Sequence, residues 1–271
     1  MEKVFSQSFY LSAGETNAEQ EISLALLTSK IIDIATAHAN SLGIGNPSME
    51  SLGCGWVLSR IAIEMERYPR VNETYTLSTW VEGWNRHFSV RNFKISDSKG
   101  EAYGYAISVW MVLNTSTREN AGLSHLHMNP EMISGETVPI GKFGRHPAIV
   151  PMPEAKEKTA EAEEKEMPRG AVRATEPAKS YVFQYADLDF YRHVNTVRYV
   201  TLLLNQFTLD EMDTTQVRRL EMAFMREGRY GETVSLLRAD DGLQTIFSLV
   251  DAAAGVPSLS AALVRCPRKR S

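Results

Sequence analysis

The stretch SYVFQYADLDFYRHVNTVRYVTLLLNQF, residues 180–207, places a strand, a loop and a helix next to one another. Ser180 to Tyr185 reads as a strand, Asp187 to Asn195 reads as a loop, and Thr196 to Phe207 reads as a helix that Asn195 can cap. Four strand candidates follow: Val217–Arg226, Glu232–Ala239, Leu243–Val250 and Leu259–Arg265. This order favours an antiparallel sheet that curls around one helix.

The first half of the chain repeats this order of elements. Phe5 to Leu11 reads as a strand, and Ala18 to Leu42 reads as a helix with Thr16 or Asn17 as its cap. Apolar residues occupy more than one face of this helix, so we expect other structure to wrap around it. Strand candidates then follow without a further helix: Arg60–Glu66, Thr74–Trp84, His87–Ser96 and Glu101–Asn114. The predicted fold class is α+β, with two tandem hot-dog units, each an antiparallel sheet wrapped around a central helix.

The segment between the two halves differs from both in composition. Pro147 to Lys179 contains several prolines, and its charged run Glu154 to Glu166 has no apolar face to bury. We therefore expect an N-terminal unit at residues 1–146, a linker at 147–178 and a C-terminal unit at 179–271.

Composition narrows the class of protein. The chain has 271 residues, of which 43% are apolar, and 29 basic against 33 acidic side chains give a net charge of -4. This balance argues against a general nucleic-acid binder, which would carry a basic excess. There is no apolar run of the roughly 18–20 residues that span a bilayer, and no secretory signal at the N-terminus. Only two cysteines occur, without metal-ligand spacing, so we expect a reducing cytoplasmic location.

Two series of short motifs point to a known family. The first series is Trp56-Val57-Leu58-Ser59-Arg60, Glu66-Arg67-Tyr68-Pro69, Ser78-Thr79-Trp80-Val81, and Ser108 to Asn114 followed by Thr117-Arg118. The second is Asp187 to Asn195, followed by Arg198-Tyr199 and Arg226-Glu227. In order and spacing, both series resemble the acyl-acyl carrier protein (acyl-ACP) thioesterases of bacteria and plant plastids. The resemblance covers nearly the whole chain apart from the linker.

The resemblance implies a thioester hydrolase acting in fatty acid biosynthesis, which releases free fatty acid from a chain linked through phosphopantetheine to acyl carrier protein. It assigns His193 to activating water or attacking the thioester, with Asp189 as its orienting or water-activating partner. Glu227 matches an acidic residue on the strand after the helix, which helps to position water or a catalytic side chain. Each residue also has a structural interpretation, because His193 can cap the helix and Glu227 can be simply solvated.

Two positions depart from the family pattern. Many relatives carry asparagine where this chain has Tyr191, so Tyr191 is expected either to orient the thioester or only to line the pocket. Plant relatives carry a cysteine after the glutamate, and Gly228 in that place excludes a cysteine nucleophile there. Backbone N–H groups near Val194 to Thr196 can bind the oxyanion, while Asn195 is either a substrate contact or only the helix cap.

The N-terminal half has no counterpart of the Asp…His loop in its sequence, since Ala13 to Asn17 occupies that place. We therefore expect one active site per chain, with the N-terminal unit supplying the acyl pocket. Trp56, Trp80 and Trp110 are candidates for the wall of that pocket, and ordinary core positions are the alternative for each. The resemblance implies no metal and no organic cofactor.

Acidic carrier proteins favour a basic docking surface. The candidates are Arg192, Arg198, Arg218, Arg219 and the tail Arg268-Lys269-Arg270. Two other functions stay open, an acyl-CoA thioesterase and a catalytically inactive acyl-binding module of the same fold. A hydratase would also use an aspartate and a histidine, but the tryptophan motifs fit the thioesterases better. A homodimer also stays open.

Overall fold

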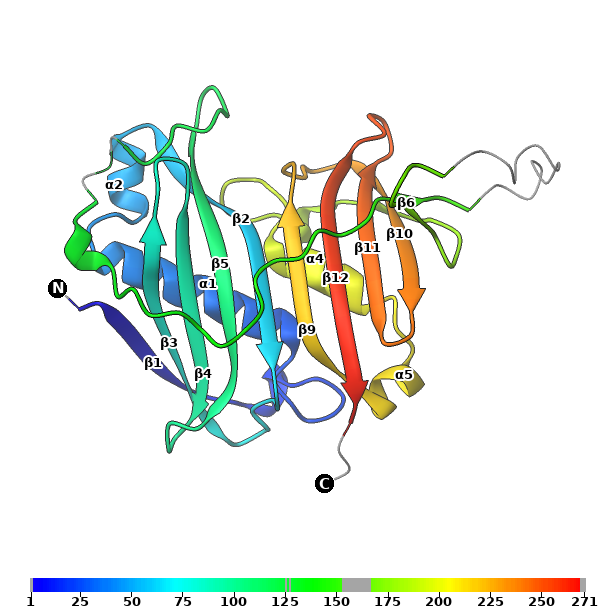
Figure 1. The fold of residues 1–271 in the computed structure, drawn as a ribbon, viewed down its shortest axis with the longest axis horizontal. Coiled ribbons are helices and arrows are strands. Elements are labelled where there is room, and N and C mark those ends of the chain that lie inside the picture. The colour runs from blue at the N-terminus through cyan, green and yellow to red at the C-terminus, as the bar shows by residue number, and fades with distance from the viewer. Residues whose placement is uncertain (1, 125, 127, 153–166, 269–271) are drawn as a thin grey trace. The chain divides into compact units, whose positions relative to one another are not determined.

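The computed structural model describes residues 2–124, 126, 128–152 and 167–268, and Figure 1 shows its fold. The chain divides into two compact units, residues 1–142 (unit 1) and residues 143–271 (unit 2). Within the described ranges, no helix is long and apolar enough to cross a membrane.

Unit 1 is an antiparallel sheet with a long helix against it (Figure 1). The strands lie in the order β1-β3-β4-β5-β2, so the N-terminal strand forms one edge. The elements are β1 (Val4–Tyr10), α1 (Leu24–Ser41), α2 (Asn46–Ser51), β2 (Cys54–Met65), β3 (Thr74–Trp84), β4 (Ser89–Asp97) and β5 (Ala102–Asn114).

Helix α1 begins six residues later than the sequence pattern indicates. Ser23 is its N-cap, and the Ser23 hydroxyl accepts a hydrogen bond from the N–H of Leu26 at 3.2 Å. The expected caps, Thr16 and Asn17, lie in the preceding loop. There the Asn17 side chain accepts the N–H of Glu21 at 2.9 Å, which closes a turn instead of starting a helix. A local side-chain bond has therefore displaced the first turn and a half of the expected helix.

The short helix α2 was not expected from the sequence. It spans only six residues, with a proline in its first turn. Such a length gives little periodicity to recognise, and tertiary packing stabilises the helix instead. Its buried Met49 packs in a cluster with Cys54, Val112, Leu123 and Leu126.

Unit 2 repeats the plan of unit 1, with strands in the order β9-β12-β11-β10-β8 and helix α4 against them (Figure 1). Tyr199 on α4 makes edge contacts with the rings of Phe183 and Phe224, with 5.7 Å between centroids in each pair. The elements are β8 (Lys179–Val182), α4 (Thr196–Leu204), α5 (Leu209–Thr214), β9 (Thr215–Phe224), β10 (Thr233–Asp241), β11 (Gln244–Asp251) and β12 (Pro257–Pro267).

The expected linker contains ordered structure at both of its ends. Its charged run, Glu154 to Glu166, lies outside the described residues. On either side of that run, β6 (Ile149–Val150) and β7 (Val172–Arg173) pair in parallel. The N–H of Thr175 then bonds to the carbonyl of Arg238 on β10 at 2.8 Å, so this segment packs onto unit 2.

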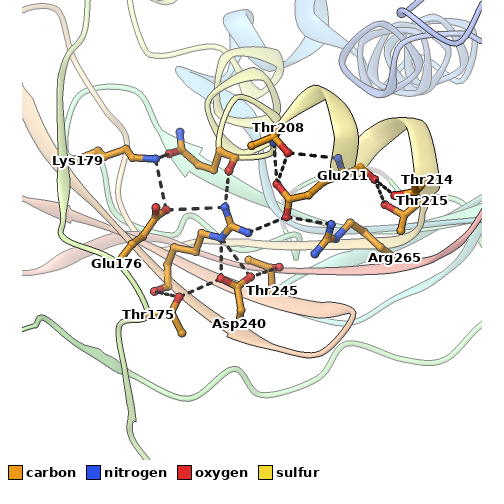
Figure 2. Close-up of polar contacts among 12 residues, drawn as sticks. Thr175, Glu176, Lys179, Thr208, Glu211, Thr214, Thr215, Asp240, Thr245 and Arg265 are labelled. Carbon is orange, nitrogen blue, oxygen red and sulfur yellow. Dashed lines mark hydrogen bonds and ion pairs between the residues drawn. The ribbon is translucent and has the colours of Figure 1, made fainter.

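Two buried arginines, Arg238 and Arg265, hold the unexpected helix α5 in place. Figure 2 shows Arg265 beside Glu211 of this helix. Glu211 on α5 accepts from Arg238 of β10 at 3.4 Å and from Arg265 of β12 at 3.3 Å. Arg238 also pairs with Asp240 at 2.9 Å, and both guanidinium groups lie over the ring of Phe207. This network fixes the connection between α4 and β9, which sequence periodicity alone did not reveal.

Candidate active site

The loop between β8 and α4 is closed by the side chain of Asp189. Its Oδ1 accepts the backbone N–H groups of Tyr191 at 2.9 Å and His193 at 3.1 Å. The N–H of Asp189 donates in turn to the carbonyl of His193 at 2.8 Å. Arg192 adopts a left-handed conformation with φ of 65°, which reverses the chain just before His193. The turn therefore fixes the backbone on both sides of the histidine.

Buried Asp187 anchors the start of the same loop. One carboxylate oxygen accepts from the Tyr181 hydroxyl at 2.8 Å and from the Gln184 N–H at 2.7 Å. The other oxygen lies 3.1 Å from Nε of Arg198, so this candidate docking arginine is paired within the loop. The Asp187 carbonyl accepts the N–H of Asn195 at 2.8 Å. These bonds join the loop rigidly to the start of α4.

The imidazole of His193 lies beside the carboxylate of Glu227. His193 Nε2 is 3.4 Å from Glu227 Oε2, and the two side chains are 20% and 26% exposed. Glu227 was expected on the strand after the helix, but β9 ends at Phe224, and Glu227 lies in the connection between β9 and β10. The N–H of Val194 donates to the carbonyl of Gly228 at 2.9 Å, which holds this connection against the loop of His193.

Asp189 contacts backbone rather than the imidazole. Its two side-chain bonds are to N–H groups, whereas the carboxylate that faces His193 belongs to Glu227. The position beside the imidazole, which sequence analysis expected Asp189 to fill, is thus occupied by Glu227. The geometry makes Asp189 the residue that sets the position of His193, and its direct part in chemistry stays a prediction.

Gly228 is required by close packing behind this pair. A Cβ atom placed on Gly228 would lie 2.6 Å from the Tyr199 hydroxyl and 2.9 Å from Cγ2 of Val194. Any larger residue would push apart the helix α4 and the loop that carries His193. A cysteine at this position would require the side chains of Tyr199 and Val194 to shift.

The start of α4 leaves one backbone donor available. Asn195 is the N-cap, as the structural interpretation of this residue expected, and its Oδ1 accepts the N–H of Val197 at 2.9 Å. The N–H groups of Val194 and Asn195 are both bonded within the loop. Of the three donors expected near the oxyanion, only the N–H of Thr196 lacks a partner among the described residues.

Tyr191 lies on the solvent side of the loop. Its side chain is 41% exposed and its ring lies 3.9 Å from the ring of Phe190, which is 75% exposed. This placement leaves Tyr191 near the surface of the loop, and its expected role in orienting the thioester stays a prediction.

Unit 1 contains a pocket between α1 and the sheet, with about 470 Å³ of unfilled space that includes a part open to solvent. Trp56 and Trp110 line this pocket, as their interpretation as pocket residues requires. Trp80 is buried, and its indole N–H donates to the carbonyl of Glu136 at 2.8 Å. Trp80 is not in the wall of this pocket, although its neighbour Val81 is.

Comparison with known families decides the identity. The N-terminal domain model of acyl-ACP thioesterases matches residues 2–126, and the C-terminal domain model of the same family matches residues 171–255. This chain belongs to the acyl-ACP thioesterase family. The recognition made from its motifs is thereby confirmed.

Individual members of the acyl-ACP thioesterase family are also similar to this chain in sequence. The chain is 27% identical over 246 residues to a chloroplastic palmitoyl-acyl carrier protein thioesterase of Gossypium hirsutum, which covers 88% of this chain. It covers 55% of that relative, so the chain spans about half the length of the curated relatives it matches.

Solved structures of the family confirm the fold prediction. An acyl-ACP thioesterase of Bacteroides thetaiotaomicron superimposes with a TM-score of 0.82 at 25% identity, over 97% of this chain and 98% of that one. The 12:0-ACP thioesterase of Umbellularia californica gives 0.76 at 18% identity, over 99% of each chain. The α+β architecture of antiparallel sheets with few helices is the hot-dog arrangement expected from sequence.

Of the lining of the unit 1 pocket, the sequence indicated only Trp56 and Trp110, and the missed residues include the polar pair Ser89 and Arg91. A signal for them exists in β4, where Ser89, Arg91, Phe93 and Ile95 alternate with other residues and therefore share one face. An arginine in line with Phe93 and Ile95, both fully buried, indicates a charged group that faces the interior.

Proposed function

We propose that this chain hydrolyses the thioester of a fatty acyl chain carried by acyl carrier protein, releasing the free acid. The observation that carries the proposal is the pair of His193 and Glu227, with 3.4 Å between Nε2 and Oε2, on a loop held by Asp189. Family membership and the acyl-ACP thioesterase of Bacteroides thetaiotaomicron support the carrier protein as the leaving thiol.

The proposed chemistry uses His193 as a general base toward water. In the proposed tautomer the ring proton of His193 is on Nε2, which faces Oε2 of Glu227 at 3.4 Å, and the lone pair of Nδ1 points away from Glu227. Nδ1 has no partner among the described residues and takes a proton from water as the water oxygen attacks the thioester carbonyl. The tetrahedral intermediate then collapses, the carbon–sulfur bond breaks, and the sulfur leaves with the proton held by His193.

The N–H of Thr196 is the proposed donor to the oxyanion. It lies at the first turn of α4, where the helix dipole favours negative charge. Asp189 positions His193 through the backbone of the loop, and its carboxylate is also the second candidate for contacting the attacking water. Tyr191 is proposed to contact the thioester. Asn195 is proposed to contact the substrate through its side-chain NH2 group, because the helix cap uses only Oδ1.

Further parts of the proposal follow the sequence analysis. Unit 1 is the proposed acyl-binding unit, with Trp56 and Trp110 in its pocket wall. The proposed partner is an acyl carrier protein with a phosphopantetheine-linked chain, and the proposed location is the cytoplasm, where Cys54 and Cys266 would stay reduced. A homodimer is the proposed alternative to a single chain.

The test is free-thiol release from a panel of acyl carrier substrates, with His193→Ala beside the unchanged chain. We expect long-chain acyl carriers to be cleaved and the variant to lose at least about a hundredfold in kcat/KM. His87→Ala, an exposed histidine of unit 1, serves as the matched control and should retain full activity.

The same panel separates the two alternative functions. Faster turnover of acyl-CoA than of acyl carriers would replace the carrier by coenzyme A as the leaving thiol. If neither substrate releases thiol, the hydrolase proposal fails, and an acyl-binding module takes its place.

A further inference from the structure

The wall of the unit 1 pocket contains a buried cation. Arg91, on β4, lines the pocket together with residues of α1, β2, β3 and β5, and its side chain is only 6% exposed. A guanidinium group is unfavourable in a pocket for a purely hydrocarbon chain. Burying a charge costs free energy unless an opposite charge or hydrogen bonds offset it.

The neighbours of Arg91 do not supply that opposite charge. Its Nη1 donates to Nδ1 of His38 at 2.8 Å and to the hydroxyl of Thr79 at 3.3 Å. His38 uses its other ring nitrogen to bond the carbonyl of Glu2 at 3.1 Å, so the imidazole is neutral with its proton on Nε2. Burial, and then the charge of Arg91, lower the pKa of His38 to about 4, in agreement with a neutral ring.

Arg91 itself remains a cation with donors to spare. Burial lowers its pKa to about 10, which still leaves it protonated at neutral pH. Among the described residues, the guanidinium of Arg91 makes its hydrogen bonds through Nη1 alone, and no carboxylate forms an ion pair with it. Two adjacent N–H groups in one plane match the two oxygens of a carboxylate.

A second donor lies on the same face of the same strand. Ser89 precedes Arg91 by two residues on β4, lines the pocket and is 6% exposed. No described residue is hydrogen-bonded to its side-chain hydroxyl. Ser89 and Arg91 together therefore present hydroxyl and guanidinium donors on one wall of the pocket.

The other walls are mainly apolar, although Thr36 and Asn46 are also part of the lining, and the Thr36 hydroxyl donates to the carbonyl of Ile32 at 3.0 Å. Ala35 and Ala39 of α1 and Val81 of β3 face the pocket. The indole N–H groups of Trp56 and Trp110 are already bonded, to the carbonyl of Ile44 and the hydroxyl of Ser108, each at 2.7 Å. The two rings therefore offer only apolar surface, and a ligand must combine a hydrocarbon part with an anionic end.

We propose that the unit 1 pocket binds a carboxylate carried on an apolar chain, with Arg91 and Ser89 on the carboxylate and Trp56 and Trp110 against the hydrocarbon. Two sources share this chemistry. One is a free fatty acid, and this source is independent of any catalytic activity. The other is the carboxyl group at the far end of a thioester-bound acyl chain, and this source rests on the proposed function.

The first experiment titrates sodium octanoate into the full chain and follows tryptophan fluorescence, with 1-octanol as the uncharged ligand of the same length. We expect saturable binding of octanoate at least about tenfold tighter than that of octanol, and a loss of this preference in Arg91→Met. Ser89→Ala should weaken octanoate binding about threefold. Arg60→Met, an exposed arginine on β2, is the matched control and should bind octanoate like the unchanged chain.

The second experiment distinguishes the two sources. Carrier protein is loaded with either an octanoyl chain or a suberoyl chain, which has the same length and a free carboxylate at its far end. If the acyl chain is the source, the unchanged protein cleaves the suberoyl carrier in preference, and Arg91→Met lowers the ratio of the two kcat/KM values at least about tenfold.

Folding is checked by circular dichroism and thermal melting of every variant. Should Arg91→Met fail to fold, Arg91→Lys, Ser89→Ala and the comparison of octanoate with octanol carry the test. Equal affinity for octanoate and octanol, together with no preference for the suberoyl carrier, would overturn the proposal. Octanoate binding without thiol release from either carrier would support it while refuting the hydrolase function.

Discussion

Two loops of this chain follow one backbone path and carry different side chains. In unit 1 the N–H of Asn17 donates to the carbonyl of Glu21 at 2.8 Å, and in unit 2 the N–H of Asp189 donates to the carbonyl of His193 at the same distance. Asn17 and Asp189 each close their turn through Oδ1. The sequence analysis expected no counterpart of the Asp…His loop in unit 1, but a counterpart exists in the backbone.

Each loop is also tied to a strand connection in the same way. Ile22 donates to the carbonyl of Pro69 at 2.9 Å, and Val194 donates to that of Gly228 at 2.9 Å. The chemistry changes at three equivalent positions, which are Asn17, Glu21 and Tyr68 in unit 1 and Asp189, His193 and Glu227 in unit 2. In both units the backbone forms the same loop bonded to a strand connection, which we call a platform. At the three positions compared, only the platform of unit 2 carries an imidazole with a carboxylate beside it.

Exchanging the histidine tests this comparison most severely. His193→Glu places the residue of unit 1 on the platform of unit 2 and removes the proposed base, so we expect kcat/KM for thiol release to fall about a thousandfold. The reciprocal change Glu21→His should alter kcat/KM less than about threefold. Equal losses in the two variants would mean that the two platforms do not differ in function.

Glu227 is the next position at which the platforms differ. Glu227→Gln keeps the shape and removes the charge beside the imidazole, so we expect kcat to fall about 10- to 100-fold with little change in KM. Tyr68→Phe, at the equivalent position of unit 1, should leave kcat within about threefold. A rise in KM alone would assign Glu227 to substrate binding instead.

The two units are also expected to respond differently to acid. The folded-state pKa of His38 in unit 1 is about 4, below its value of 6.5 in the unfolded chain, so the unfolded state binds more protons between these values. Stability should therefore fall as pH decreases from 6.5 to 4, by about 2 kcal/mol at pH 5. His38→Gln should reduce this dependence in thermal melts, whereas exposed His87→Gln should not.

Glu221 makes the stability of unit 2 depend on pH over a lower pH range than His38 does in unit 1. Burial would raise its pKa, but hydrogen bonds from His146, the Gly144 N–H and Arg219 outweigh burial and lower the pKa to about 2. Its stabilising contribution is complete above the unfolded value of 4.5 and is lost as pH falls toward 2. Hydrogen exchange measured peptide by peptide should therefore show unit 1 losing protection at a higher pH than unit 2.

The smallest effect is expected for Asp189→Asn, which installs the residue found at the equivalent position of unit 1. Asparagine retains the Oδ1 acceptor that closes the turn, as Asn17 shows, so we expect less than about a tenfold loss in kcat. Asp189→Ala removes the acceptor and should cost more. A loss of a hundredfold or more in Asp189→Asn would instead make the carboxylate charge of Asp189 part of the chemistry.

The strands and their succession along the chain were predictable because alternation and turn residues mark them. The expected strand Thr74–Trp84 has the bounds of β3, and Glu101–Asn114 differs from β5 by one residue. The start of α1 and the presence of α2 and α5 were not predictable, because a local bond of Asn17 and the tertiary contacts of Met49 and Glu211 decide them.

Parts of the candidate site were predictable from the sequence and parts were not, for the same reason. The loop from Asp187 to Asn195 and its helix cap follow from residues close in sequence. The contact of His193 with Glu227 joins residues 34 positions apart (227 − 193), and neither pattern nor spacing reveals which carboxylate faces the imidazole. The alternation along β4 contained the signal for Arg91, but a single inward-facing cation is recognised only when its neighbours are known.

The tight packing at Gly228 has a consequence for redox chemistry. With glycine at position 228, the proposed catalytic loop and the connection between β9 and β10 contain no thiol, and their one sulfur is the thioether of Met225. The two cysteines of the chain are a buried residue of β2 and a residue near the end of β12. Alkylating reagents and peroxide therefore have no thiolate to attack at the proposed site. Cys54 is buried in the cluster of Met49, whereas Cys266 is partly exposed. A fluorophore placed on Cys266 can therefore report on unit 2 without a thiol at the proposed site being modified.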